Sequence, residues 1–334
     1  MLLAGLAAPA GSAPKTDVVE LVNGDRITGE IKSLEHNQLE ISTEYMDTVY
    51  LEWDEVARLH STQSLSLVRT DGSRHYGQLA QGSDAGKLYV DPGDGRPVER
   101  LEMATVVSAS PITGGRLIDR LDGYVTAGLD FTKASDQRDL DFTGGLSSRT
   151  LVRRWSIDAS ASITDDSAVE RSERYDLQAN WRRFLPGRDF YQGFGGLTRN
   201  SELDLDLRAL LGGLYGRYLV RTNVAEWAVG GGLAYSHERY TAEQLDSIEA
   251  VLSTDFSIFR YDFPETNIGG TLNVLPSLTQ SGRHRAEASL QAKYEFVDDL
   301  YFQLSLYGSY DSKPPGAEKE SSDYGVTTSL GYSF

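Results

Sequence analysis

The sequence predicts an all-β protein: a transmembrane antiparallel β-barrel of about 12 strands preceded by a small tandem β module. Three observations predict this class. From about residue 119 to residue 334, segment after segment alternates apolar and polar residues, as strands with one apolar face do. The first part of the chain contains two copies of one short-strand pattern. No stretch holds about 18 uninterrupted apolar residues, so a membrane-spanning helix is excluded.

Composition agrees with this class and narrows the function. The chain is 40% hydrophobic with a mean hydropathy of -0.37, values that a barrel of alternating strands shares with ordinary proteins. It has no cysteine, which excludes disulfide frameworks and thiolate metal sites. A net charge of -17, from 32 basic and 49 acidic residues, argues against a nucleic-acid partner.

Residues 1–13 resemble the remainder of a secretory signal peptide. A short apolar run leads to Ala8-Pro9-Ala10, a cleavage site of the A-x-A type. The basic amino-terminal region of such a signal is missing, so either the start codon is assigned too late or the segment is a disordered apolar tail. The pattern favours export from the cytoplasm.

Residues 14–110 are predicted to form a tandem module with repeats at about 17–62 and 65–110. Asn23-Gly24 in the first repeat aligns with Asp71-Gly72 in the second, and both dipeptides are typical of tight hairpin turns. Short strands follow each turn. The pattern therefore predicts a small SH3-like or Sm-like β-roll used twice, with Trp53, Val56 and Leu59 in its core.

Many Sm-like rolls bind RNA, but this module has the wrong charge for that. Residues 14–110 contain 9 Lys and Arg against 17 Asp and Glu, a net charge of -8. A periplasmic spacer, or a module that docks a periplasmic protein partner, is therefore favoured over an RNA-binding module.

A linker at 111–118 leads into the predicted barrel, residues 119–334. In the segment 155–163, for example, Trp155, Ile157 and Ile163 alternate with serines and an aspartate. Twelve such segments in 216 residues leave about 18 residues for each strand and its connection, which is typical of outer-membrane hairpins. A soluble β protein is the alternative, but the polar faces are too rich in Asp, Arg, Gln and Ser for a dry core.

Connections and tyrosines support the same interpretation. The connections mostly alternate between short ones and longer polar ones, as periplasmic turns and extracellular loops do. Of the 18 tyrosines, 14 follow residue 119, many near strand ends, where aromatic girdles meet the lipid headgroups. An even strand number places both termini in the periplasm. We therefore expect the outer membrane of a Gram-negative bacterium and contact with its lipid.

The chain ends on another alternating segment, DYGVTTSLGYSF, which predicts the last strand of the barrel. This strand has to pair with the first one, because a free edge cannot be satisfied in lipid. Tyr332 and Phe334 at its end resemble the signal by which the barrel-assembly machinery recognises its clients.

The stretches LVNGDRITGEI and TEYMDTVYLEWDEVARL, together with the ending GYSF, are similar to the salt-induced outer-membrane protein family, the YdiY-like proteins. The resemblance covers most of the chain. It implies an outer-membrane β-barrel of unsettled function, sometimes linked to salt stress. It supplies no catalytic residues.

Nothing in the sequence predicts an enzyme, a cofactor or a metal. The five histidines lack the spacing of metal ligands. Ser236 and His237 resemble the Ser and His of outer-membrane phospholipases, but neighbours on a strand point to opposite faces and cannot form a nucleophile–base pair.

The predicted lumen is rich in carboxylates. Its candidate residues are Asp141, Asp158, Asp176, Arg182, Asp204, Asp206, Arg208, Asp255, Glu287, Lys293 and Glu295. We expect a narrow channel that prefers cations, or an envelope-maintenance protein for osmotic or salt stress. The alternatives are a plugged barrel that anchors the periplasmic module to a partner and, second, an outer-membrane hydrolase.

Overall fold

The structure is a computed structural model, and it describes residues 15–112, 121–132, 137–150, 152–166, 169–201, 204–240, 243–297, 300–314 and 321–332. The chain divides into two compact units, residues 1–113 and 114–334. Among the described residues, no helix is long and apolar enough to cross a membrane. The predicted signal peptide, Phe334 and most of the predicted linker lie outside the described residues.

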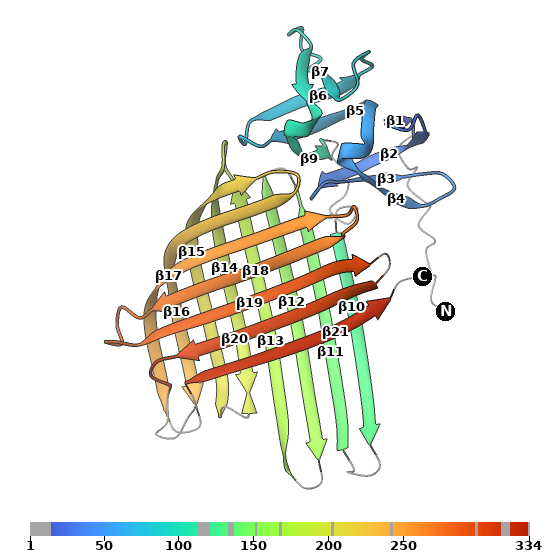
Figure 1. The fold of residues 1–334 in the computed structure, drawn as a ribbon. Coiled ribbons are helices and arrows are strands. Elements are labelled where there is room, and N and C mark those ends of the chain that lie inside the picture. Colours follow the sequence, from blue (N-terminus) through green and yellow to red (C-terminus); the bar gives the residue numbers. More distant parts are fainter. Residues whose placement is uncertain are drawn as a thin grey trace, which may run out of the picture. The chain divides into compact units, whose positions relative to one another are not determined.

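The first unit is a nine-stranded antiparallel sheet in the order β4-β3-β2-β1-β5-β6-β7-β8, with β9 pairing to β2 and β5 (Figure 1). Its strands are β1 (Asp17–Leu21), β2 (Arg26–Glu35), β3 (Gln38–Ser42), β4 (Thr48–Glu52), β5 (Val56–Arg69), β6 (Arg74–Ala80), β7 (Lys87–Asp91), β8 (Glu99–Glu102) and β9 (Val106–Pro111). Two 3-10 turns, η1 (Trp53–Glu55) and η2 (Met103–Thr105), each follow an edge strand.

The same turn appears twice in this unit. Gly24 and Gly72 have φ angles of +93° and +81°, a backbone region that residues other than glycine rarely adopt. The residue before each glycine accepts a backbone hydrogen bond on its side-chain oxygen, from Asp25 N to Asn23 and from Ser73 N to Asp71, both at 2.9 Å. The Asn-Gly and Asp-Gly turns of the two sequence repeats are thus equivalent in structure.

Each copy also closes with the same hydrogen bond. Val22 N donates to Glu55 O, and Thr70 N donates to Thr105 O, both at 2.9 Å. The long strand β5 serves both copies, because its first half pairs with β1 and its second half pairs with β9. The two copies therefore share one strand and form one sheet.

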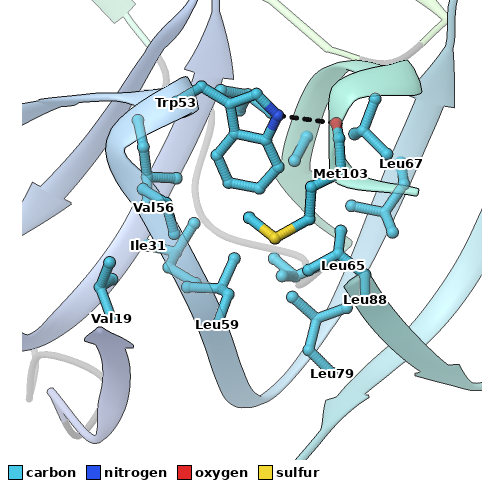
Figure 2. Close-up of a cluster of buried hydrophobic side chains, with 14 of the residues drawn as sticks. Val19, Ile31, Trp53, Val56, Leu59, Leu65, Leu67, Leu79, Leu88 and Met103 are labelled. Carbon is cyan, nitrogen blue, oxygen red and sulfur yellow. Dashed lines mark hydrogen bonds between the residues drawn. The ribbon is translucent and has the colours of Figure 1, made fainter. Parts of the chain in front are cut away.

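Both copies contribute to a single apolar core. Trp53 in η1 is 3% exposed, and its Nε1 donates to the carbonyl of Met103 in η2 at 2.9 Å (Figure 2). Val56 and Leu59 lie in the same cluster, as the sequence predicts. The other buried members are Val19, Ile31, Leu34, Leu39, Ile41, Leu65, Leu67, Leu79, Leu88, Val90, Leu101, Val106 and Ala109.

A buried carboxylate holds three strands of the first copy together. Asp17 on β1 is fully buried and accepts a hydrogen bond from Ile31 N on β2 at 2.8 Å. It also accepts one from Ser61 Oγ on β5 at 2.7 Å and one from Gln63 Nε2. These donors compensate for the removal of the carboxylate from water.

The second unit is a sheet of twelve antiparallel strands, each paired with its neighbours in sequence. The strands are β10 (Leu121–Thr132), β11 (Gln137–Arg149), β12 (Arg153–Asp166), β13 (Val169–Phe184), β14 (Asp189–Asn200), β15 (Leu205–Arg221), β16 (Ala225–Tyr240), β17 (Gln244–Arg260), β18 (Thr266–Pro276), β19 (His284–Val297), β20 (Leu300–Asp311) and β21 (Ser322–Tyr332). This arrangement fits the predicted barrel of about 12 strands, and the all-β class is confirmed.

This sheet curls on itself, and in Figure 1 the red strands β19–β21 cross in front of the green strands β10–β13. The hydrogen-bonded path among the described residues runs from β10 at one end to β21 at the other. Pairing of these two end strands, which would close the barrel, remains a prediction.

Candidate functional site

The twelve-stranded sheet has one concave and one convex face. Residues in register on neighbouring strands point to the same side, so one face can be followed across the whole sheet. The residues of its buried apolar cluster all lie on a single face, which we call the concave face. The sheet therefore curls around these side chains.

The convex face is apolar and exposed. It carries large hydrophobic side chains on every strand; examples are Val125, Leu140, Ile157, Leu177, Leu197, Leu211, Leu233, Leu252, Leu272, Tyr294, Phe302 and Val326. Monomeric soluble proteins rarely expose so large a continuous apolar surface. Near the end at which β10 begins and β21 ends, Trp155 stands in register with Trp181, and the rings of Tyr191 and Tyr215 are 5.5 Å apart. This placement is typical of an aromatic girdle.

On the concave face, β13–β18 carry a packed apolar cluster. Phe190 on β14 is 1% exposed, and its ring lies 5.4 Å from that of Tyr218 on β15. The cluster consists of Phe184, Phe190, Leu214, Tyr218, Ala228, Ala234, Val251 and Leu275, with Phe194 and Leu210 packed against it. Side chains therefore fill the interior beside these strands.

Arg182 on β13 lies against one end of the apolar cluster. Its guanidinium stacks 4.1 Å from the centre of the Phe190 ring and donates to Gln192 Oε1 at 2.7 Å and to Tyr218 Oη at 3.0 Å. It also lies 3.5 Å from Asp255 on β17, four strands away in the sheet. In a flat sheet that separation would be about 19 Å, so the contact reaches across the curled interior.

At the other end of the apolar cluster lies a group of three carboxylates and three arginines, here called the carboxylate–arginine cluster. Glu238 on β16 is at its centre and is 1% exposed. All three arginines form ion pairs with Glu238, with nitrogen–oxygen distances of 2.8 Å for Arg208, 2.8 Å for Arg283 and 3.1 Å for Arg285. Arg283 also pairs with Asp311, and Arg285 also pairs with Glu249, both at 2.6 Å.

This cluster holds distant strands together. Glu238 on β16 and Arg285 on β19 are three strands apart, about 14 Å in a flat sheet, yet their side chains form an ion pair. Arg283, in the connection before β19, is 4% exposed. Burial alone would lower its pKa, but hydrogen bonds and charge from Asp311 and Glu238 raise that pKa above its ordinary value. The guanidinium therefore stays charged.

The remaining concave surface, on β10–β13, β20 and β21, is polar and open. Among the side chains that the structure describes there, the exposed carboxylates are Asp122, Asp130, Asp141, Asp158 and Asp323, and the exposed cations are Arg154 and Arg174. Arg174 is already 3.0 Å from Asp176. This side of the interior is therefore acidic, and water reaches it.

Most of the lumen residues predicted from sequence occupy concave positions. Asp141, Asp158 and Glu287 are exposed there. The others form contacts: Asp176 accepts from Thr198 at 3.0 Å, Arg182 and Asp255 approach each other, Arg208 binds Glu238, Lys293 binds Glu265 at 2.8 Å, and Glu295 accepts from Glu265 N at 3.2 Å.

Two of the predicted lumen residues lie at or just before the start of β15. Asp204 precedes β15, in a turn with a φ of +48°. Asp206 belongs to a β-bulge between Leu205 and Leu207. Because a bulge adds one residue to the strand, the alternation shifts there, and Asp206 lies 4.0 Å from Arg239 on the convex face. The predicted lumen position is therefore wrong for Asp206, whereas for Asp204 it stays a prediction.

Sequence reasoning missed most of the carboxylate–arginine cluster. The predicted residues do not include Glu238, Glu249, Arg283 or Arg285. Three of these, Glu238, Glu249 and Arg285, lie on the concave face of their strands, where alternation could have found them. The apolar cluster had a visible signal. In β15, leucines occupy both faces of the strand, as at Leu210 and Leu211, which indicates a strand that is apolar on both sides.

Ser236 and His237, the residues of the hydrolase alternative, lie on opposite faces of β16. Ser236 is buried on the concave face, whereas His237 lies on the convex face. The Nδ1 of His237 is 2.8 Å from Asp246 Oδ1, and Tyr235 Oη donates to the same oxygen at 2.6 Å. The proposed assembly signal has one described residue, Tyr332, which is exposed on β21.

Comparison with known proteins supports one assignment. Residues 125–334 match the family model described as "Protein of unknown function, DUF481". Neither the curated proteins nor the solved structures contain a match to the chain. The matched region spans β10 to β21 and more than half of the sequence. The chain therefore belongs to the DUF481 family, which is the YdiY-like, salt-induced outer-membrane protein family.

Proposed function

We propose that this protein is an outer-membrane β-barrel with a narrow passage that prefers cations. One observation carries the proposal: the open part of the concave face exposes more carboxylates than cations, with Asp122, Asp141, Asp158 and Asp323 among them. Carboxylates beside a narrow aqueous path raise the local concentration of cations and repel anions. The apolar convex face supplies the surface that lipid would cover.

The passage runs along β10–β13, β20 and β21, because the apolar and carboxylate–arginine clusters fill the side beside β14–β19. Such a path suits small ions better than large solutes. With an even number of strands, β10 begins and β21 ends at the same end of the sheet. Both termini, and an SH3-like or Sm-like module at 14–110, then lie in the periplasm. A cation path also fits an envelope role under osmotic or salt stress.

The two filled clusters favour a second candidate, in which the barrel is sealed and anchors the first unit to a partner. Glu249, Arg283 and Arg285 are each at most 4% exposed, as in a permanently packed interior. The two candidates differ in one measurable property, because a sealed barrel conducts no ions.

Reconstitution of the full chain in planar bilayers with a KCl gradient tests the proposal. We expect discrete single-channel currents and a reversal potential that lies between zero and the equilibrium potential of potassium. In the double variant Asp141→Asn, Asp158→Asn the potential should move toward zero, because two carboxylates beside the passage lose their charge. The matched control is Asp206→Asn, which removes an acidic residue from the convex face and should leave the potential unchanged.

Absence of current from correctly folded protein would reject the channel in favour of the sealed anchor. A preference for chloride would also reject it. If the Asp206→Asn control changed the potential as much as the double variant did, the passage would not follow the concave carboxylates.

A further inference from the structure

The duplication in the first unit creates two equivalent sheet edges. β4 ends the first copy and β8 ends the second, and each is followed by a 3-10 turn. Among the described strands, β4 pairs with β3 alone and β8 pairs with β7 alone. An unpaired strand edge can accept another strand unless the protein protects it. The two copies therefore allow one edge to be compared with the other on the same scaffold.

The β8 edge is protected. β8 has only four residues and follows Pro97, which cannot donate a backbone hydrogen bond. Its Arg100 forms an ion pair with Asp84 at 2.8 Å, and Arg96 in the preceding turn pairs with Asp94 at 2.9 Å. A short strand, proline and charge are the usual devices that prevent edge pairing.

The β4 edge lacks the proline and the paired arginines of the β8 edge, and the charged residues in the surrounding stretch 33–57 are all acidic. It has five residues and no proline, and exposed apolar side chains gather along it. Tyr45 and Met46, in the turn before β4, are 95% and 62% exposed, and Tyr50 within β4 is 60% exposed. Tyr50 occupies the position that Arg100 holds in the second copy, because Glu40 and Tyr89 are their respective register partners. The aromatic residue stands where the protected edge has a paired cation.

The surroundings of this edge are acidic. Residues 33–57 contain no lysine or arginine, whereas the equivalent part of the second copy contains both. The acidic residues of this stretch are Glu35, Glu40, Glu44, Asp47, Glu52, Asp54 and Glu55. The exposed edge thus combines a strand side that no other described strand covers, two tyrosines and negative charge.

We propose that β4 is a docking edge for an extended, cationic segment of a partner protein, which adds to the sheet as a further strand. Backbone hydrogen bonds to β4 would hold the segment. Tyr45 and Tyr50 would contact its aliphatic or cationic side chains, and the acidic residues would attract its lysines and arginines. A second copy of the chain or an anionic lipid surface fits less well, because both carry the same charge sign as the edge. This proposal does not depend on whether the barrel conducts.

The test uses the full chain in micelles of a zwitterionic detergent and a synthetic peptide of roughly eight residues that alternates lysine and valine. Amide hydrogen exchange reports where the peptide binds. We expect slower exchange within 48–52, tighter binding than that of a glutamate–valine peptide, and weaker binding as salt rises. Tyr50→Arg, which copies the protected edge, should weaken binding about tenfold or more. Tyr76→Arg changes an exposed tyrosine on the interior strand β6 and should have no effect.

Several results would overturn the proposal. One is the absence of protection within 48–52, and another is equal binding of the acidic peptide. Protection at 99–102 in place of β4 would show that the comparison of edges fails. If Tyr50→Arg instead abolished self-association of the chain, or its binding to anionic vesicles, the edge would serve a second copy or a lipid surface.

Discussion

Replacement of Glu238 by glutamine should destabilise the twelve-stranded sheet more than any other single charge removal on its concave face. The substitution keeps the shape of the side chain and removes its charge. Glu238 receives hydrogen bonds from Arg208 at 2.8 Å, Arg283 at 2.8 Å and Arg285 at 3.1 Å. In the variant Arg283 would keep Asp311 and Arg285 would keep Glu249, whereas Arg208 would lose the carboxylate of Glu238.

The magnitude follows from burial. The side chains of Glu238, Arg283 and Arg285 are 1%, 3% and 4% exposed, so water screens their charges little. Removal of one partner from a buried ion pair costs about 3–5 kcal/mol, because the other charge stays buried without compensation. Arg283 and Arg285 each keep a second carboxylate at 2.6 Å, which places the expected loss near the lower value.

Urea-driven unfolding of the full chain in phospholipid vesicles measures this loss, with heat-modifiable gel migration as the readout for the folded barrel. At a slope of about 2 kcal/mol per molar urea, a loss of about 3 kcal/mol lowers the midpoint by about 1.5 M. The matched control is Glu287→Gln, an exposed concave glutamate, which should change stability by about 0.5 kcal/mol or less. Equal midpoints for Glu238→Gln and wild type would refute the view that the cluster holds the curled strands together.

Further predictions concern the convex face and the first unit. Leu211→Arg, in the middle of β15 on the convex face, should lower the free energy of unfolding in vesicles by about 2–4 kcal/mol. Thr143→Arg on the concave face should lower it far less, and urea titration of both variants in vesicles makes the comparison. Trp53→Ala should destabilise the first unit by about 3–5 kcal/mol, seen as a lower melting temperature in calorimetry of the full chain, and an unchanged melt would contradict its core role. The Asp71 carboxyl has a pKa below its ordinary 3.8, chiefly because the Ser73 side chain and backbone donate hydrogen bonds to it. The stability it contributes is therefore present above about pH 3.8 and is lost as pH falls through the lower folded value; a carboxyl titration midpoint by NMR at or above 3.8 would exclude this.

Sequence alternation predicted the twelve strands because each strand has an apolar convex face and a more polar concave face. That rule is local and does not depend on how strongly the sheet curls. For the same reason most of the predicted lumen residues, including Asp141 and Glu287, lie on the concave face. It failed at Asp206, where one inserted residue at a bulge moves the side chain to the other face.

The contacts inside the sheet could not be predicted in the same way. The ion pair between Glu238 and Arg285 joins strands that are not neighbours, and it exists because of the curl. The alternation of side chains along a strand specifies the face of each residue, but it carries no information about which residues meet across the interior. The first unit differs, because its repeats could be aligned by their turns, and Trp53, Val56 and Leu59 could be placed in its core from the sequence.

Closure of the barrel connects its assembly to its proposed selectivity. An unpaired strand edge in hydrocarbon leaves backbone groups without partners, each at a cost of several kcal/mol, so we expect β10 and β21 to pair if the sheet spans a membrane. They have similar lengths of 12 and 11 residues, and both are apolar on the convex face. On the concave face, β10 ends near Asp130, which is in register with Asp139, and β21 begins near Asp323. Antiparallel pairing of the two strands places these carboxylates at the same end of the seam. Pairing of β10 with β21 would thus remove the last free edge and also bring these carboxylates together, so we expect the cation preference only in the closed barrel.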